Sequence, residues 1–348
     1  MIIRLLTFPF RYAISKIKKW LGNLDKIKVE PLYAFGNEEC IFVKARVVEA
    51  YRQSRPSEKN NRFQNVLAAL RRYAGSSVPD ARVTVTCAGQ QHVLESDEEG
   101  IVSGKFRAPM GKKLHADSVI FKLQEEEGLV REHKEEEIPV CQFSKNHPTG
   151  IISDIDDTVL VSHATEIGKK LWLSVSKNAY TRRPFPGVSK FYHALTNAGE
   201  HPIFYVSSSD WNLFDMIKDF MDFRNIPSGP LLLQDLHLNL KNIWKSGGGN
   251  HEHKLEKVRM LLAIYPGMNF FLIGDSGQHD PELYEQVIKE HPGRVKTVYI
   301  RKVKHEITEE RMEMVHNLKE IPNSPEVIFV KDTEEALKHA LEHSFIVQ

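Results

Sequence analysis

The sequence predicts an α/β fold in which a parallel sheet flanked by helices follows a smaller β-rich part, and two patterns lead to this prediction. From about residue 27 to 145, apolar and polar residues mostly alternate, which is typical of antiparallel strands. After residue 149, short apolar runs alternate with helical stretches, which is typical of a parallel sheet. With 348 residues, 41% of them hydrophobic, the chain is long enough for two separate cores.

Residues 1–24 are predicted to form a basic amphipathic helix. At about 100° per residue, the apolar side chains fall on one stripe and most basic side chains lie elsewhere. Arg4, Pro9 and Arg11 interrupt the segment and no small-residue cleavage site follows, so neither a signal peptide nor a membrane span fits. Two partners fit the stripe: a groove on the protein itself, or an anionic membrane surface that residues 1–22 contact. The stripe consists of Ile3, Leu6, Phe10, Ile14, Ile17 and Leu21.

Residues 25–145 are predicted to form a β-sandwich-like accessory domain. The stretches ARVTVTCAG and QQHVLESDEEGIVSGKF alternate apolar and polar residues, and an acidic turn at Asp97–Gly100 separates two strand candidates. Helical spacing interrupts this pattern between residues 63 and 73. The glutamate runs at 125–127 and 135–137 are interpreted as a solvated hairpin or linker, because runs of like charge usually face water.

Charge and cysteine content exclude several classes of protein. Lys and Arg total 47 and Asp and Glu total 46, so no excess of positive charge favours nucleic-acid binding. The three cysteines are widely spaced and form no CxxC pair, which argues against a disulfide framework or a structural zinc site. We therefore expect a reducing, cytoplasmic location, with peripheral membrane contact if the N-terminal stripe lies on a bilayer.

Residues 146–348 are predicted to form the parallel α/β domain. Four apolar runs end in polar residues, and in parallel sheets ligands bind beyond the carboxyl ends of the strands. The polar residues that end these runs should therefore meet in one crevice. The runs are GIISDID, HPIFYVSSS, NFFLIGDS and RVKTVYIRK, and helices are expected over 188–199, 211–225, 254–265 and 281–291.

The run GIISDIDDTVL places three carboxylates directly behind a buried strand, where like charges repel one another and need a partner. A solvated turn would more often carry Gly, Pro or Asn there. We predict a Mg²⁺ site formed by Asp154, Asp156 and Asp275, because a small, hard cation prefers carboxylate and water oxygens. Asp280 is interpreted as an outer residue that orients the metal ligands or Lys254.

The same residues provide the parts that phosphoryl transfer needs. A carboxylate that attacks a phosphate monoester meets an anionic target, so a divalent cation, a lysine and hydroxyls must hold the phosphoryl oxygens. Asp154 would form an aspartyl phosphate, and Asp156 would act first as acid and then as base. The catalytic candidates are Asp154, Asp156, Ser207 and Lys254, and the phosphate-binding candidates are Thr158, Ser207, Ser208 and Lys254.

The pieces DxDxT, a strand ending in Ser, a Lys and GDSGQHD occur in the order and at the spacings of haloacid-dehalogenase (HAD) superfamily phosphatases, which this part of the chain resembles. The resemblance implies a HAD-like sheet. Only 52 residues lie between Asp154 and Ser207 and 46 between Ser207 and Lys254, which leaves little room for a large cap. His251 and His253 are interpreted as solvent-facing or phosphate-side groups rather than zinc ligands.

A narrower resemblance covers about residues 145–305. The stretches SDIDDTV, RPFPGV, FYVSSSDWNLFD and FLIGDSGQHDPELY, with the pair His253-Lys254, are similar to the actin-patch-protein family of Mg²⁺-dependent phosphatidate phosphatases, related to the lipin-type catalytic domain. The resemblance implies dephosphorylation of phosphatidate to diacylglycerol, with Asp154 and Asp156 as the catalytic pair. One departure is Asp210, which stands where the family pattern has Pro and is interpreted as a helix cap.

Three functions fit these observations. The first is a lipid phosphatase, and the second is a HAD phosphatase for a soluble phosphoester, since chemistry at phosphorus does not name the leaving group. The third is a non-catalytic phosphatidate-binding module, which would not need the nucleophile, so the presence of both Asp154 and Asp156 disfavours it. The lack of a large cap favours the first, because an open mouth suits a bulky or membrane-embedded substrate.

Overall fold

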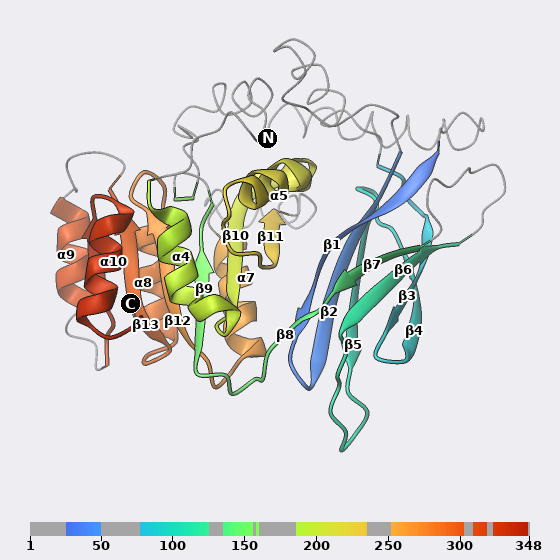
Figure 1. The fold of residues 1–348 in the computed structure, drawn as a ribbon, viewed down its shortest axis with the longest axis horizontal. Coiled ribbons are helices and arrows are strands. Elements are labelled where there is room, and N and C mark those ends of the chain that lie inside the picture. The colour runs from blue at the N-terminus through green and yellow to red at the C-terminus, as the bar shows by residue number, and fades with distance from the viewer. Residues whose placement is uncertain are drawn as a thin grey trace, which may run out of the picture. The chain divides into compact units, whose positions relative to one another are not determined.

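The computed structural model describes residues 26–49, 77–124, 135–155, 158–159, 186–234, 252–302, 309–318 and 323–346. Several predictions lie outside these residues, namely those for the N-terminal helix, the helix between residues 63 and 73, the glutamates at 125–127, Asp156 and His251. The described residues fall into two compact units, which meet in the chain between Ser144 and Lys145. The described part of the first unit contains strands, and the second unit combines strands with helices (Figure 1).

The first unit contains two four-stranded sheets, in the orders β5-β2-β1-β8 and β4-β3-β6-β7. Neighbouring strands are antiparallel, apart from β1 and β8, which are parallel. Both sheets contribute to one hydrophobic core, to which β5 adds Phe106 and β6 adds Phe121. The strands are β1 (Ile27–Gly36), β2 (Cys40–Glu49), β3 (Arg82–Cys87), β4 (Gln90–Glu95), β5 (Ile101–Arg107), β6 (Ser118–Leu123), β7 (Glu135–Pro139) and β8 (Cys141–Gln142).

Two tight turns of this unit follow from the local sequence. The turn Ala88-Gly89 between β3 and β4 has φ angles of 50° and 74°, as a type I′ hairpin turn requires. The predicted acidic turn is present between β4 and β5, where the Asp97 carboxylate accepts the N–H groups of Glu99 and Ile101 at 2.8 Å each. This second turn joins strands of different sheets. Alternation of residues therefore predicted these strands, but not which strands pair.

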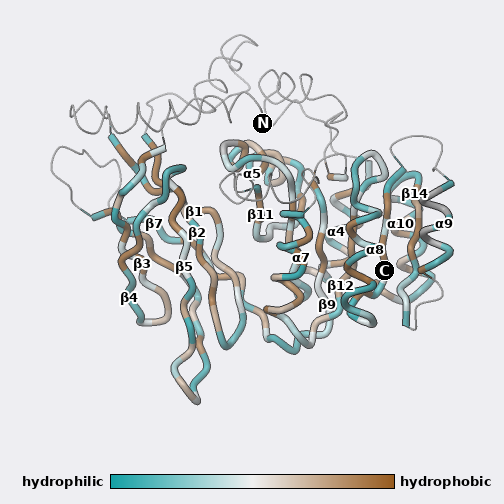
Figure 2. The backbone as a smooth tube through the Cα atoms, turned by 180° about the vertical axis from the view of Figure 1, so that it is seen from behind, coloured by the Kyte–Doolittle hydropathy of each residue, from teal (hydrophilic) through white to brown (hydrophobic). Residues whose placement is uncertain are grey.

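The second unit is built on a six-stranded parallel sheet in the order β11-β10-β9-β12-β13-β14. The prediction of a parallel sheet flanked by helices is therefore confirmed. The four predicted apolar runs form the four inner strands, and Figure 2 shows hydrophobic residues along the strands of this sheet. The strands are β9 (Thr149–Ser153), β10 (Ile203–Asp210), β11 (Leu231–Gln234), β12 (Asn269–Asp275), β13 (Val295–Arg301) and β14 (Glu326–Val330).

Helices cover both faces of this sheet. Figure 1 shows α4 and α10 together on one face, and α7 and α8 on the other, with α9 beside α8. α5 follows β10 after the short 3₁₀ helix Trp211–Leu213. The helices are α4 (Val188–Thr196), α5 (Phe214–Phe223), α7 (Glu252–Ile264), α8 (Asp280–Glu290), α9 (Glu309–Leu318) and α10 (Thr333–Glu342). The first four agree with the predicted helices to within a few residues, whereas α9 and α10 are additional to them.

The strand order creates a switch point between β9 and β12. The chain moves outward from β9 through β10 to β11, returns across the sheet to β12, and then moves outward on the other side through β13 to β14. In open parallel sheets the crevice at such a point, beyond the carboxyl ends of the strands, is where ligands bind. Asp154 follows β9 and Asp275 ends β12, so both predicted acids lie at this point.

β9 lies in the middle of the sheet and is buried along its whole length. Gly150 allows β12 to approach, because a Cβ atom there would lie 2.4 Å from Sδ of Met268 and 2.8 Å from Cε1 of Phe270. A larger residue would push apart the two strands that carry the acids.

The turn between α7 and β12 is held by Arg294. Its guanidinium donates to the carbonyls of Tyr265 at 2.7 Å and Met268 at 2.9 Å.

No helix in the described part of the chain has the length and hydrophobicity that a membrane-spanning segment needs.

The three cysteines, Cys40, Cys87 and Cys141, are free thiols. Burial raises the pKa of Cys87 to about 11 and that of Cys141 to about 12, so both are protonated near neutral pH and are poor nucleophiles.

Candidate active site

Asp154 is the first residue after β9, and its side chain is 2% exposed. Its backbone N–H donates to the carbonyl of Ile273 on β12 at 2.8 Å, which extends the pairing of the two strands by one residue. The Ser153 hydroxyl donates to the Asp154 carbonyl at 2.7 Å. The backbone on both sides of the peptide is therefore fixed, and the carboxylate projects beyond the strand end from a rigid base.

Lys254, in the first turn of α7, connects two of the acids. Its Nζ lies 2.7 Å from Oδ1 of Asp154 and 2.9 Å from Oδ1 of Asp280. The three side chains are at most 6% exposed, so water screens these charges weakly. Burial by itself lowers the pKa of Lys254, but the two carboxylates outweigh it and hold that pKa above its ordinary value. Lys254 is therefore an ammonium at neutral pH.

Asp275 ends β12 and organises the turn that follows it. Its Oδ1 accepts the backbone N–H groups of Gly277 at 2.6 Å and Gln278 at 3.0 Å, and its Oδ2 accepts the Gln278 side-chain amide at 3.0 Å. The N–H of Asp275 donates to Oδ2 of Asp280 at 3.1 Å. Gln278 received no role from the sequence, although it lies inside the GDSGQHD stretch.

Gly274 allows Asp280 to reach the strand. A Cβ atom on Gly274 would lie 2.7 Å from Oδ2 of Asp280 and 2.9 Å from Cε2 of Tyr284. Asp280 and Pro281 open α8, which positions the acid at the start of the helix. Asp280 thus contacts both Lys254 and the backbone of Asp275.

The acids form one cluster with an oxygen-only donor set. Asp154, Asp275 and Asp280 each have a carboxylate oxygen within 4.8 Å of the other two. With Lys254 the cluster holds three negative charges and one positive charge, a net charge of −2 when all are ionised. Such a donor set fits Mg²⁺ or a similarly hard cation. The structure thus brings two of the predicted ligands together, with Asp280 beside them, while Asp156 lies outside the described residues.

Ser207 and Ser208 lie on β10, next to β9. The Oγ of Ser207 is buried and accepts the N–H of Ser209 at 2.9 Å, which orients the hydroxyl. The Ser207 carbonyl accepts a hydrogen bond from Nε2 of His253 at 3.4 Å. His253 is buried and therefore does not face solvent, whereas its position on the phosphate side stays a prediction.

Thr158 is a predicted phosphate-binding residue, and Asp210 is the departure from the family pattern. The Thr158 hydroxyl lies 3.5 Å from Oδ2 of Asp154, a long contact on the side of the carboxylate away from Lys254. Asp210 is the last residue of β10 and pairs with Gln234 on β11. It directly precedes the 3₁₀ helix, and its interpretation as a helix cap stays a prediction.

Two buried tyrosines support the strands that carry the acids. The Tyr192 hydroxyl lies 2.7 Å from Oγ of Ser153, and the Tyr284 hydroxyl donates to the Ile273 carbonyl at 2.8 Å. Burial raises the pKa of both tyrosines, so both stay neutral hydroxyls. Tyr284 lies at the end of the FLIGDSGQHDPELY stretch, but no pattern pointed to Tyr192, since its partner is distant in sequence.

Buried carboxylates beside an ammonium, at the switch point of a parallel sheet, are typical of metal-assisted phosphoryl-transfer enzymes. Comparison with known proteins narrows this class. Residues 149–302 match the family described as the catalytic domain of phosphatidate phosphatase APP1. This region of the chain is therefore similar to the catalytic domain of APP1-type phosphatidate phosphatases.

Two curated relatives match the chain over part of their length. Phosphatidate phosphatase APP1 of Saccharomyces cerevisiae is 29% identical over 182 residues, which is 51% of this chain and 30% of the yeast protein. An uncharacterized protein of Schizosaccharomyces pombe is 25% identical over 199 residues, which is 57% of this chain and 32% of that protein. The chain therefore spans about a third of the length of these relatives.

Among solved structures, a carbohydrate acetylesterase from Xanthomonas citri aligns with 87% of this chain and 68% of its own. The sequence identity is 12% and the TM-score is 0.31. This likeness is too weak to support a conclusion about fold or function.

Replacing Lys254 by Met should destabilise the second unit. The change keeps the unbranched stem of the side chain but removes the cation between two buried carboxylates, so we expect the free energy of unfolding to fall by roughly 3–5 kcal/mol at pH 7. Urea unfolding at pH 7 measures this loss.

The matched control is Lys289→Met. Lys289 forms an exposed ion pair with Glu285 on α8, and its loss should cost at most about 1 kcal/mol at pH 7. A Lys254→Met protein as stable at pH 7 as the Lys289→Met protein would show that Lys254 does not hold the carboxylates together.

Proposed function

We propose that this chain is a Mg²⁺-dependent phosphatase that hydrolyses phosphatidate to diacylglycerol and phosphate through an aspartyl-phosphate intermediate. The observation that carries the proposal is the buried cluster of Asp154, Asp275 and Lys254 at the switch point, within the region that matches a phosphatidate phosphatase catalytic domain. We also propose that residues 146–348 form a HAD-like domain without a large cap, and that residues 25–145 form a β-sandwich-like domain.

In this mechanism Asp154 is the nucleophile. One carboxylate oxygen attacks the phosphorus of the substrate, the bond from phosphorus to the glycerol oxygen breaks, and the phosphoryl group is carried on Asp154. The Lys254 ammonium on Oδ1 orients the carboxylate so that Oδ2 is the attacking atom, on the side where Thr158 lies. Burial of the carboxylate keeps water from competing for its lone pairs before substrate binds.

Asp156 provides the proton transfers. It donates a proton to the glycerol alkoxide as that group leaves, and then takes a proton from the water that attacks the aspartyl phosphate. The attack releases inorganic phosphate and restores the Asp154 carboxylate. The spacing of the two acids in the sequence, with one residue between them, supports this pairing with Asp154.

The anionic phosphoryl group is held by Lys254 and by the hydroxyls of Ser207, Ser208 and Thr158. Lys254 comes from α7 and the serines from β10, so the group would be gripped from two directions. Asp154, Asp156 and Asp275 would hold Mg²⁺, with Asp280 orienting Lys254 and Asp275. When bound, Mg²⁺ neutralises the charge of the phosphoryl oxygens and of the attacking carboxylate.

The substrate class can be tested directly. Purified protein with Mg²⁺ is offered phosphatidate in mixed micelles, beside a panel of soluble sugar phosphates and an aryl phosphate, and phosphate release is measured. We expect much faster release from the lipid, and loss of activity with a chelator that Mg²⁺ restores. Equal or greater activity on a soluble phosphoester would favour a HAD phosphatase for small metabolites, and binding of phosphatidate without turnover would favour a lipid-binding module.

Asp154→Asn should abolish turnover while leaving the fold intact. The substitution keeps the side-chain volume but removes the nucleophile, so we expect the rate to fall at least about 10³-fold, with an unchanged thermal midpoint to within a few degrees. Asp222→Asn, an exposed position on α5, is the matched control and should keep full activity. Incubation with a phosphate-mimicking fluoride complex should trap the mimic beside Asp154. Substantial activity of Asp154→Asn would mean that another group attacks phosphorus.

Membrane contact through residues 1–22 is proposed from their sequence pattern. Deleting these residues should weaken binding to anionic vesicles by roughly tenfold or more, since each basic residue near the surface adds about 1 kcal/mol. Turnover of phosphatidate on vesicles should fall, while hydrolysis of a soluble aryl phosphate should not change. If the stripe packs on the protein instead, the truncated chain should lose thermal stability and both activities together.

A further inference from the structure

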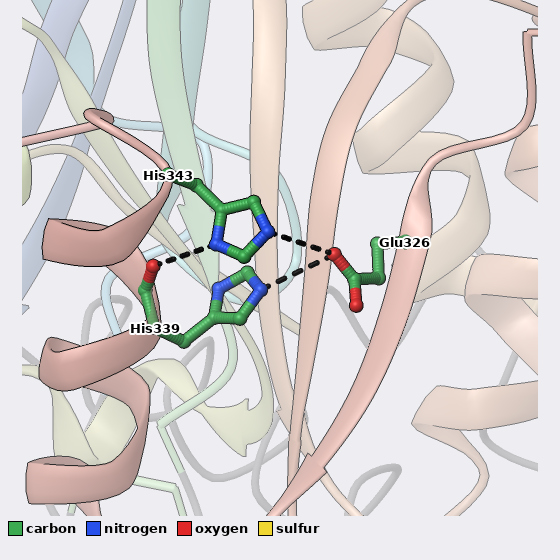
Figure 3. A group of neighbouring side chains, drawn as sticks. All are labelled: Glu326, His339 and His343. Carbon is green, nitrogen blue, oxygen red and sulfur yellow. Dashed lines mark hydrogen bonds and ion pairs between the residues drawn. The ribbon is translucent and has the colours of Figure 1, made fainter.

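A second cluster of metal-ligating side chains lies at the opposite end of the sheet from the acids. Glu326 is the first residue of β14, and His339 and His343 lie one turn apart near the end of α10 (Figure 3). One ligand atom from each residue lies within 4.8 Å of the others. β14 runs parallel to β9 and β12. Its first residue therefore lies away from the carboxyl ends of the strands, where Asp154 and Asp275 are found. The cluster is therefore separate from the candidate active site.

Both imidazole rings direct Nε2 at the same carboxylate oxygen. Nε2 of His339 lies 3.2 Å from Oε2 of Glu326, and Nε2 of His343 lies 3.7 Å from the same atom. The two rings are stacked, with centroids 3.9 Å apart and planes 24° from parallel. Both Nε2 atoms thus face one carboxylate oxygen between α10 and β14, as Figure 3 shows.

The remaining ring nitrogen of His343 has a defined partner. Its Nδ1 lies 3.0 Å from the carbonyl oxygen of His339. A carbonyl only accepts, so the proton of a neutral His343 ring is on Nδ1 and Nε2 carries a lone pair. That lone pair points at a carboxylate, which also only accepts when ionised. A cation between Nε2 and Oε2 turns this juxtaposition of two acceptors into a favourable contact.

His339 is oriented in a similar way. Its Nδ1 lies 3.1 Å from the hydroxyl of Tyr299 on β13, a contact that either group can make as donor. With Nδ1 donating to Tyr299, the Nε2 lone pair of His339 also faces Oε2 of Glu326. A fixed partner on the second ring nitrogen is the arrangement that orients metal-ligating histidines in proteins.

The local backbone holds the rings in place. Ser344 adopts a left-handed φ of 56°, its N–H donates to the Leu341 carbonyl, and the N–H of Phe345 donates to the Ala340 carbonyl at 2.9 Å. This is a Schellman motif that ends α10 directly after His343. The Phe345 ring then packs on the His343 ring, with centroids 5.8 Å apart. The carbonyl end of a helix also favours a positive charge.

The distances suit a tetrahedral ion. Bonds of about 2.0–2.1 Å to Zn²⁺ at tetrahedral angles separate the ligand atoms by about 3.3 Å. Oε2 of Glu326 lies 3.2 Å from Nε2 of His339 and 3.7 Å from Nε2 of His343, and these two distances lie on either side of this value. Imidazole nitrogens with one carboxylate suit Zn²⁺ and related transition ions, and not Mg²⁺, which prefers oxygen.

We propose that Glu326, His339 and His343 bind one Zn²⁺-type ion, which fastens the end of α10 to the first residue of the edge strand β14. Glu326 and His343 have side chains 56% and 45% exposed, so the ion can enter from solvent and a water can occupy the fourth position. His339 is 15% exposed and forms the inner wall. The ion would stabilise the last helix and would not take part in phosphoryl transfer.

The test uses the full-length chain, stripped of metal by a chelator and dialysed, with excess Mg²⁺ present to occupy the oxygen-ligand site. Zn²⁺ is titrated by calorimetry, Co²⁺ by its visible absorption, and the thermal midpoint is recorded with and without Zn²⁺. The ligand variants are Glu326→Gln and His343→Gln, which are partly exposed and should fold. Tyr299→Phe tests the orienting contact, and should weaken Zn²⁺ binding by about tenfold.

The matched controls are Glu342→Gln, an exposed acid beside His343, and His316→Gln, an exposed histidine on α9. We expect each ligand variant to lose one equivalent of Zn²⁺, the tetrahedral Co²⁺ absorption and the Zn²⁺-induced rise in the midpoint, while both controls keep all three. Wild-type stoichiometry and spectrum in His343→Gln would overturn the proposal. So would a wild-type chain that binds no Zn²⁺, which would mean that a proton alone joins the histidines to Glu326.

Discussion

The ammonium of Lys254, held between the carboxylates of Asp154 and Asp280, is the interaction on which the site depends. The two contacts join residues 100 and 26 positions apart in the sequence, and so connect α7 to the end of β9 and to the start of α8. Burying carboxylates without a partner costs several kcal/mol each, so these elements are stable together only with the lysine in place. The interaction that holds the elements also orients the proposed nucleophile.

The surrounding structure keeps this arrangement rigid. Small residues at Gly150 and Gly274 allow β12 to approach β9 and Asp280 to approach β12. The hydroxyls of Tyr192 and Tyr284 form hydrogen bonds with the Ser153 hydroxyl and the Ile273 carbonyl near the ends of these strands. In the proposed reaction, a preorganised site of this kind would need little rearrangement when charge develops on the transferring phosphoryl group.

The two clusters at opposite ends of the sheet differ in chemistry as well as in place. The acids at the switch point offer only oxygen, whereas the cluster of α10 and β14 offers two nitrogens and one oxygen. Ligand type is the main means by which proteins separate hard ions from transition ions, so the two sites should not compete for the same metal. One end of the sheet would then serve catalysis and the other stability.

The sequence by itself determined the change from alternating strands to an α/β pattern near residue 145, and it placed Asp154, Asp275 and Lys254 together, because each follows or begins an element with a clear apolar period. It did not reveal the strand order, the role of Tyr192, or the meeting of Glu326 with the two histidines of α10. These depend on which elements pack side by side. Periodicity records the environment of each segment but not its neighbours, so only the tertiary structure decided them.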